Sequence, residues 1–175
     1  MPCKLHPYHK LRDWRKDNLK CTRTEDGKMA DTKIYFAGSI RAGRGDAEIY
    51  YGIVSCLKSH GKVLTEHVGD VSLHKDGEVH LTDEEIYRRD MDWLKESDIL
   101  AAEVSTPSLG VGYEIREAEK LGKKALCLYR PQEGKRLSAI ISGSGIPVKT
   151  YSSLEEAAKI IDSFFSEFSK AIEKA

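Results

Sequence analysis

The stretch ILAAEVSTPSLGVGYE, residues 99–114, decides the fold that the sequence predicts. Its first six residues are almost wholly apolar, as in a parallel strand that is covered on both faces. Pro107 and two glycines then let the backbone turn closely into a helix, which we expect from about Gly110 to Leu121. A buried strand that leads through a short turn into a helix is the repeating unit of α/β proteins.

The same unit recurs on both sides of this stretch. Further strands are predicted at 33–37, 63–65, 125–129 and 146–150. Further helices are predicted from Asp46 to a closing Gly61, from a capping box at Thr82–Glu85, and from Ser153 along an apolar stripe to Ile172. Strands that alternate with helices predict an α/β fold with a mostly parallel sheet and helices on both faces. Such sheets bind ligands outside the carboxyl ends of their strands.

Length and composition limit the kinds of protein that this chain can be. Its 175 residues suit one domain, and its 28 Lys+Arg against 28 Asp+Glu do not favour nucleic acid as the main partner. No apolar run is long enough for a membrane span. The four cysteines form no C-x-x-C pair, so we expect a reduced, intracellular protein.

Residues 1–31 differ from the rest of the chain. They hold eight Lys/Arg against five Asp/Glu and show no sustained helical or strand period. We interpret them as a flexible N-terminal extension, and residues 32–175 as a single α/β catalytic domain. The alternative for the extension is a basic arm for localisation or nucleic-acid binding.

A glycine-rich segment, GSIRAGRG at residues 38–45, follows the first strand. Its three glycines, its hydroxyl at Ser39 and its two arginines between a strand and a helix suit an anion such as phosphate. The segment is neither G-x-G-x-x-G nor a P-loop. The alternative is a flexible turn that needs glycines, Gly43 among them, only to bend.

Two acids are candidates for catalysis. Glu114 falls in the predicted first turn of its helix, where an acid also has the plain explanation of stabilising the helix dipole. Asp90 lies within the apolar stripe of the preceding predicted helix, whereas Asp92 shares the polar side with Arg88, Arg89 and Lys95. A buried acid must be paired, hydrogen-bonded or protonated, so Asp90 is either a structural ion pair or an acid for a leaving group.

Two further side chains lie at the predicted ligand-binding rim. His67, at the expected end of the second strand, could contact a ligand or bond to backbone. Tyr35, inside the first strand, could be core or could reach an active carboxylate. We find no spacing typical of metal ligands and no His near Cys56 or Cys127 that would indicate a thiol nucleophile. We therefore expect neither a metal nor another cofactor.

Several strings together resemble the Rcl-type 2′-deoxynucleoside 5′-phosphate N-hydrolases of the nucleoside 2-deoxyribosyltransferase superfamily. They are YFAGSIR (35–41), LTEHV (64–68), Asp90 with Trp93-Leu94, AEV (102–104), PSLGVGYE (107–114), Cys127-Leu128 with RPQ (130–132), and LSA (137–139). The likeness runs from about residue 33 to 165. It implies a flavodoxin-like, Rossmann-type three-layer fold with a five-stranded sheet, and a cytoplasmic homodimer that is found also in the nucleus.

The resemblance also implies a reaction and roles for single residues. The substrate is a deoxynucleoside 5′-monophosphate, Glu114 is the nucleophile that forms a covalent glycosyl intermediate, Asp90 assists departure of the base, and Tyr35 orients Glu114. His67 lies near the base or sugar, and Ser138 reaches the phosphate from the neighbouring subunit. The positions that surround the nucleotide are Gly38, Ile40, Arg41, Ala42, Ser108 and Gly110. Ala42 replaces a glycine of the mammalian forms, and residues 69–81 differ in length and composition, so the preferred base stays open.

Three alternatives remain at this stage. A nucleoside 2-deoxyribosyltransferase would pass the sugar to another base, but it handles free nucleosides, whereas Arg41, Ser108 and Ser138 suit a phosphate. A relative could instead hydrolyse ribonucleotides such as CMP. A nucleotide-binding regulator without catalysis would lack one of the acids, yet both are present.

Overall fold

The structure is a computed structural model, and it describes residues 31–40, 46–72 and 77–173. Strands and helices alternate along this part of the chain. In order they are β1 (Lys33–Ala37), α1 (Ala47–Leu57), β2 (Lys62–Val63), the 3-10 helix η3 (Glu66–Gly69), α2 (Asp83–Glu96), β3 (Ile99–Glu103), α3 (Leu109–Lys120), β4 (Lys124–Tyr129), α4 (Ala139–Gly143), β5 (Val148–Thr150) and α5 (Leu154–Ile172).

The five strands form one sheet in the order β2-β1-β3-β4-β5, and every neighbouring pair is parallel. This is the strand order of flavodoxin-like folds, so the predicted fold is confirmed. The order reverses between β1 and β3. Ligands of such sheets bind outside the carboxyl ends of the strands at this reversal.

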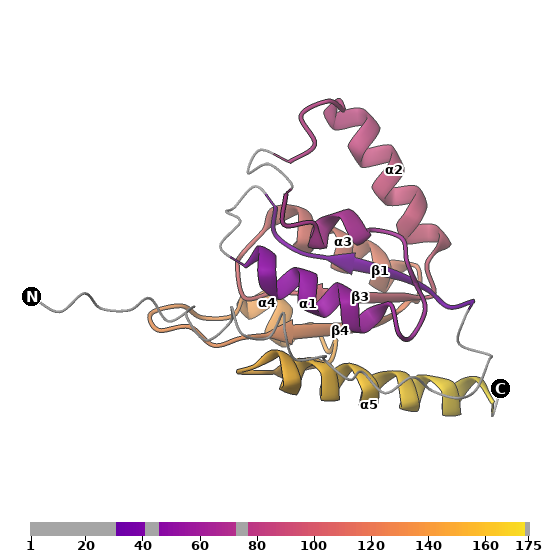
Figure 1. The fold of residues 1–175 in the computed structure, drawn as a ribbon, viewed down its shortest axis with the longest axis vertical. Helices are drawn as coiled ribbons and strands as arrows, with labels where there is room; N and C mark the ends of the chain where they lie inside the picture. Colours follow the sequence, from indigo (N-terminus) through magenta and orange to yellow (C-terminus); the bar gives the residue numbers. More distant parts are fainter. Residues whose placement is uncertain (1–30, 41–45, 73–76, 174–175) are drawn as a thin grey trace, which may run out of the picture.

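Helices cover both faces of the sheet, which gives three layers. Alternate residues of β1 divide between two cores: Ile34 and Phe36 pack with α1 and α5, while Tyr35 and Ala37 pack with α2 and α3. Figure 1 shows α5 on one side of the strands and α2 and α3 on the other. The period of two along a strand therefore turns Tyr35 toward the face that carries α3.

The second strand and its surroundings differ from the prediction. β2 ends at Val63, and the chain then forms η3, so His67 lies in a 3-10 helix rather than at a strand end. Thr65 cannot continue the strand because its hydroxyl accepts from the Phe36 amide at 2.8 Å and donates to the Phe36 carbonyl at 2.8 Å. Gly61 does not close α1 in the left-handed region. It is required because a Cβ there would overlap the Thr32 carbonyl oxygen.

Helix boundaries follow the capping signals closely. The predicted capping box at Thr82 and Glu85 is formed, and Ser153 accepts from the Glu156 amide at the start of α5. α3 begins at Leu109, so Glu114 lies in its second turn, and the prediction of a first-turn position is wrong. The favourable interaction of an acid with the helix dipole falls off within the first turn. It therefore does not explain why an acid stands at position 114.

The short helix α4 was not predicted, since its sequence AIISG has only five residues and carries no capping box. Within the described ranges, no helix combines the length and the apolar character that a membrane span requires.

Candidate active site

A hydrogen bond joins the strand and the helix that meet at the reversal of strand order. The Tyr35 hydroxyl on β1 donates to Glu114 Oε1 on α3 at 2.7 Å. Tyr35 is 1% exposed, and burial raises its pKa far above the ordinary value, so the phenol keeps its proton and remains a donor. Glu114 is partly buried, between Val111 and Ile115, which are fully buried. The expectation that Tyr35 contacts Glu114 is therefore correct, although the two residues are 79 positions apart in the sequence.

The environment of Glu114 favours its neutral form. Burial raises its pKa to about 7, the hydrogen bond from Tyr35 opposes this rise, and the negative charge of Asp90 adds to it. At neutral pH this carboxyl is therefore about half ionised. A carboxylate with a raised pKa is a stronger nucleophile or base than an ordinary exposed one, and such groups gather at functional sites.

Asp90 of α2 is the inward-facing acid, as predicted. Its side chain is 19% exposed, whereas that of Asp92 is 64% exposed and pairs with Lys95. Burial raises the pKa of Asp90, and hydrogen bonds from Arg89 oppose the rise. Because its charge raises the pKa of Glu114, the two acids act on each other electrostatically. The structure therefore brings together the three residues that the sequence proposed for catalysis.

Arg89 and Glu78 belong to this group, and the sequence interpretation missed both. Arg89 was expected on the polar side of α2, but its long side chain bends inward and is 22% exposed. Its Nε and Nη2 donate to Asp90 Oδ1 at 3.0 and 2.9 Å, and its Nη1 and Nη2 donate to the two oxygens of Glu78 at 2.7 and 2.6 Å. Helical spacing gives the direction of Cβ only, so it cannot predict where an arginine head ends.

His67 and Trp93 complete the wall beside Asp90. The His67 ring lies 5.7 Å from Trp93, and the Arg89 guanidinium lies 4.7 Å from the centre of the Trp93 ring. His67 Nε2 lies 3.5 Å from Glu78. Burial lowers the pKa of His67, with Glu78 acting against this effect. His67 is thus largely neutral at pH 7, suited to hydrogen bonding rather than to holding a charge.

The segment after β1 is described only in part. Gly38 and Ser39 follow the strand directly, and Ile40 packs against the core beneath α1 and α5. Ser39 is 0% exposed, and its Oγ has no hydrogen-bond partner among the described residues. The predicted site residues Arg41, Ala42 and Gly43 lie outside those residues. A buried hydroxyl without a partner is costly, which favours a ligand that accepts or donates there.

The remaining predicted residues lie on α3 and α4. Ser108 is the N-cap of α3, where its Oγ accepts from the Val111 amide at 3.4 Å, and Gly110 is exposed in the first turn. Ser138 precedes α4 and does not cap it. A hollow of about 860 Å³ lies elsewhere, between β4 and α5, and none of the predicted residues lines it.

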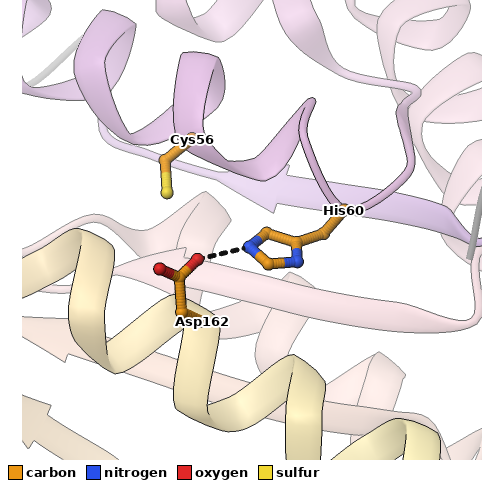
Figure 2. Close-up of side chains that lie close together, drawn as sticks. All are labelled: Cys56, His60 and Asp162. Carbon is orange, nitrogen blue, oxygen red and sulfur yellow. Dashed lines mark hydrogen bonds and ion pairs between the residues drawn. The ribbon is translucent and has the colours of Figure 1, made fainter. Parts of the chain in front are cut away.

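A second cluster gathers a cysteine, a histidine and an acid away from this site (Figure 2). The ligand atoms of Cys56, His60 and Asp162 lie within 4.8 Å of one another. The sequence interpretation missed that Cys56 stands four residues before a histidine. His60 bonds to Asp162 at 2.7 Å and stacks on Phe165 with ring centres 4.5 Å apart. Cys56 is disulfide-bonded, so the expectation of reduced cysteines is wrong for this residue. The cluster therefore ties the end of α1 to α5 without offering a thiolate.

The fold and the paired acids at the strand reversal define a class of protein, an α/β enzyme that acts on a small ligand through carboxylates. Residues 34–153 match the nucleoside 2-deoxyribosyltransferase family. The chain belongs to that family.

Similar proteins carry names that specify a nucleotide. A 5-hydroxymethyl-dUMP N-hydrolase of Tetraodon nigroviridis is 49% identical over 140 residues, which cover 77% of this chain and 97% of the relative. The mouse protein of the same name is 51% identical over 119 residues, covering 67% and 69%. Among solved structures, a CMP N-glycosidase of Clostridium botulinum has a TM-score of 0.53 and 19% identity, and the match covers 76% of this chain and 99% of that one. At this identity the likeness concerns the fold alone.

Proposed function

We propose that this chain hydrolyses the N-glycosidic bond of 2′-deoxynucleoside 5′-monophosphates, releasing the free base and 2-deoxyribose 5-phosphate. The observation that carries the proposal is the acid pair at the strand reversal, in which Glu114 accepts from Tyr35 at 2.7 Å and its pKa is raised by burial and by Asp90. Glycoside hydrolysis commonly uses two carboxyl groups of this kind. The names of relatives that are 49% and 51% identical support the same reaction.

In the proposed mechanism the two acids have different roles. Ionised Glu114 attacks C1′ of the sugar while the bond from C1′ to the base nitrogen breaks, and protonated Asp90 gives its proton to the departing base. The product is a deoxyribosyl ester of Glu114. Water then attacks C1′ and loses a proton to Asp90, which frees the sugar phosphate and restores both acids. Tyr35 holds Glu114 Oε1, so that one carboxylate orientation faces the sugar.

The rest of the site positions the nucleotide. The N-terminus of α3, capped by Ser108, suits the 5′-phosphate, and the Ser39 hydroxyl, which has no hydrogen-bond partner among the described residues, lies in the segment that we assign to the same group. His67 and Trp93, next to Asp90, suit the base. Since Asp90 must protonate the base nitrogen, the base has to lie on this side. We assign the same function to Gly38, Ile40 and Gly110 as parts of the backbone that borders the ligand.

We also propose that the enzyme is a homodimer, with Ser138 completing the phosphate site of the neighbouring subunit. Two exposed apolar side chains support the proposal that a second subunit covers this part of the surface. Leu109, beside Ser108, is 96% exposed, and Ile140, beside Ala139 at the start of α4, is 81% exposed. A monomer rarely leaves large apolar side chains so open at a binding site. We expect a cytoplasmic enzyme that is found also in the nucleus, and a fluorescent fusion in cells would test this location.

A panel assay tests the reaction. The protein is incubated with deoxynucleoside monophosphates (5-hydroxymethyl-dUMP first), with ribonucleotides and with free deoxynucleosides, and the released base is read by chromatography. We expect base release from the deoxynucleotides only, and none from Glu114→Gln. Addition of a second base tests for transfer. With methanol present, a double displacement yields the methyl glycoside of retained configuration, whereas an inverted product would remove the covalent step.

A further inference from the structure

A buried polar network outside the proposed catalytic group joins the loops that follow three strands. Asp46, the residue before α1, is 6% exposed, and its side chain does not cap that helix. Its Oδ1 accepts from Arg130 Nη2 at 2.5 Å, and its Oδ2 accepts from the Thr106 hydroxyl at 3.0 Å. Thr106 lies in the loop between β3 and α3, and Arg130 directly follows β4. One carboxylate therefore fastens two other loops to the start of α1.

The network continues inward to a buried acid at the end of β3. The Arg130 amide donates to Ser105 Oγ at 2.6 Å, and Ser105 Oγ in turn donates to Glu103 Oε1. The Tyr151 hydroxyl donates to the same oxygen at 2.9 Å. Glu103 is 0% exposed, and burial raises its pKa. Buried ionic groups of this kind are weak stabilisers compared with apolar side chains, so they indicate a requirement for one defined arrangement.

The network positions Ser108 more directly than it positions Glu114. Ser108 stands two residues after Thr106, at the very start of α3, so the loop that the network fastens sets its position. Glu114 lies in the next turn, where the buried Val111 and Ile115 and the hydrogen bond from Tyr35 fix it independently. A disturbance of the network should therefore act on the phosphate end of the site before it acts on the nucleophile.

We propose that Asp46 and Arg130 are a pair of positioning residues that preorganise the Ser105–Ser108 loop for the 5′-phosphate of the substrate. This inference rests on the proposed function. The Arg130 guanidinium donates to Asp46 and its backbone amide donates to Ser105, so we assign Arg130 to holding the loop rather than to binding phosphate itself. A displacement of about 1 Å in a loop that positions a substrate is enough to lower the reaction rate about 100-fold.

Binding of 2′-deoxyuridine 5′-monophosphate, measured by calorimetry, tests the pair. The measurement uses the Glu114→Gln background, so that turnover plays no part and a failure of the proposed reaction does not affect the outcome. Asp46→Asn and Arg130→Lys should each weaken binding of the nucleotide about 10-fold or more. Binding of deoxyuridine, which lacks the phosphate, should change less than about 2-fold. Arg116→Lys is the matched control, because Arg116 is exposed and pairs with Glu119 one turn along α3.

Asp46→Asn separates a positioning role from direct phosphate binding. If Arg130 is itself a phosphate ligand, removal of its anionic partner frees it and tightens nucleotide binding, which would overturn the proposal. Equal losses for nucleotide and nucleoside would overturn it as well, because they indicate general loosening. Should either single variant fail to fold by circular dichroism, the double variant Asp46→Ala with Arg130→Met, which leaves no buried unpaired charge but removes the link between the loops, is measured instead. Unchanged nucleotide binding by that folded double variant would contradict the proposal.

Discussion

Replacement of Tyr35 by Phe should move the pH dependence of the reaction to higher pH. The phenol donates to Glu114 Oε1 at 2.7 Å, and this hydrogen bond lowers the pKa of Glu114, which is about 7 in the native protein. Phe keeps the packing of the buried ring and removes only the donor. Without the donor the carboxylate is less stable, so the pKa of Glu114 rises.

The size of the shift follows from the strength of the bond. A hydrogen bond to a charged group contributes about 1.5–3 kcal/mol, and one pKa unit corresponds to about 1.4 kcal/mol. The neutral carboxyl recovers part of the bond, so we expect a rise of about 1 unit. The ionised fraction of Glu114 at pH 7 then falls from about one half to about one tenth. At pH 9 most of the rate should return.

The assay is kcat/KM for the best deoxynucleotide between pH 5 and pH 10. Glu114 keeps its proton to higher pH than Asp90 in the free protein, so the alkaline limb follows Glu114 and the acid limb follows Asp90, with values that belong to the coupled pair of carboxyls. Tyr113→Phe is the control, since Tyr113 precedes Glu114 on α3 and its hydroxyl lies 3.3 Å from that of Tyr87. An alkaline limb that stays in place, or a loss of rate that is equal at every pH, would refute the electrostatic role of Tyr35.

Three further predictions concern stability, the proton on Asp90 and the oligomer. The folded pKa of Glu114 is raised from 4.5 to about 7, so the native protein loses stability as pH rises from about 4.5 to 7. Glu114→Gln removes this loss, at most about 3 kcal/mol, and should melt several degrees higher at pH 8.5 but nearly unchanged at pH 4. In Glu78→Gln the Arg89 guanidinium pairs with Asp90 alone, which lowers the pKa of Asp90. The acid limb of the same profile should therefore move to lower pH, and an upward movement would contradict the contact. Mixing Glu114→Gln and Ser138→Ala chains should restore up to about one quarter of native activity through hybrid dimers, whereas no recovery after subunit exchange would place Ser138 outside the partner's site.

Much of the fold could be predicted because its signals are local. The apolar run 99–104 and the capping residues Thr82 and Ser153 act through the backbone within a few residues, and the structure has them where expected. β2 was predicted too long, since the hydrogen bonds of Thr65 to Phe36 depend on a strand 29 residues away. Gly61 was misinterpreted for the same reason: it adjoins the backbone of Thr32, which no local pattern indicates.

The residues of the candidate site also divide into those that the sequence predicts and those that it does not. Asp90 could be recognised because an acid within an apolar stripe is visible in the sequence, and Tyr35 and Glu114 because their strings resemble a family. Arg89 and Glu78 could not, because their meeting depends on the path of the loop before α2 and on the reach of a flexible side chain. Asp46 gave a misleading signal, since an acid before a helix suggests a cap, yet both of its oxygens bond to other loops.

The arrangement of charges explains why the site needs both Arg89 and the substrate. In the free protein Arg89 stabilises the negative charge of Asp90, while burial and Asp90 together keep about half of Glu114 protonated at pH 7. The proposed mechanism requires the reverse distribution, with the proton on Asp90 and the charge on Glu114. Glu78 makes this exchange possible, because it already holds two donors of Arg89 and competes with Asp90 for the guanidinium. A base that enters beside Asp90 excludes water and further raises the pKa of that carboxyl, so binding itself favours the reactive form of the pair.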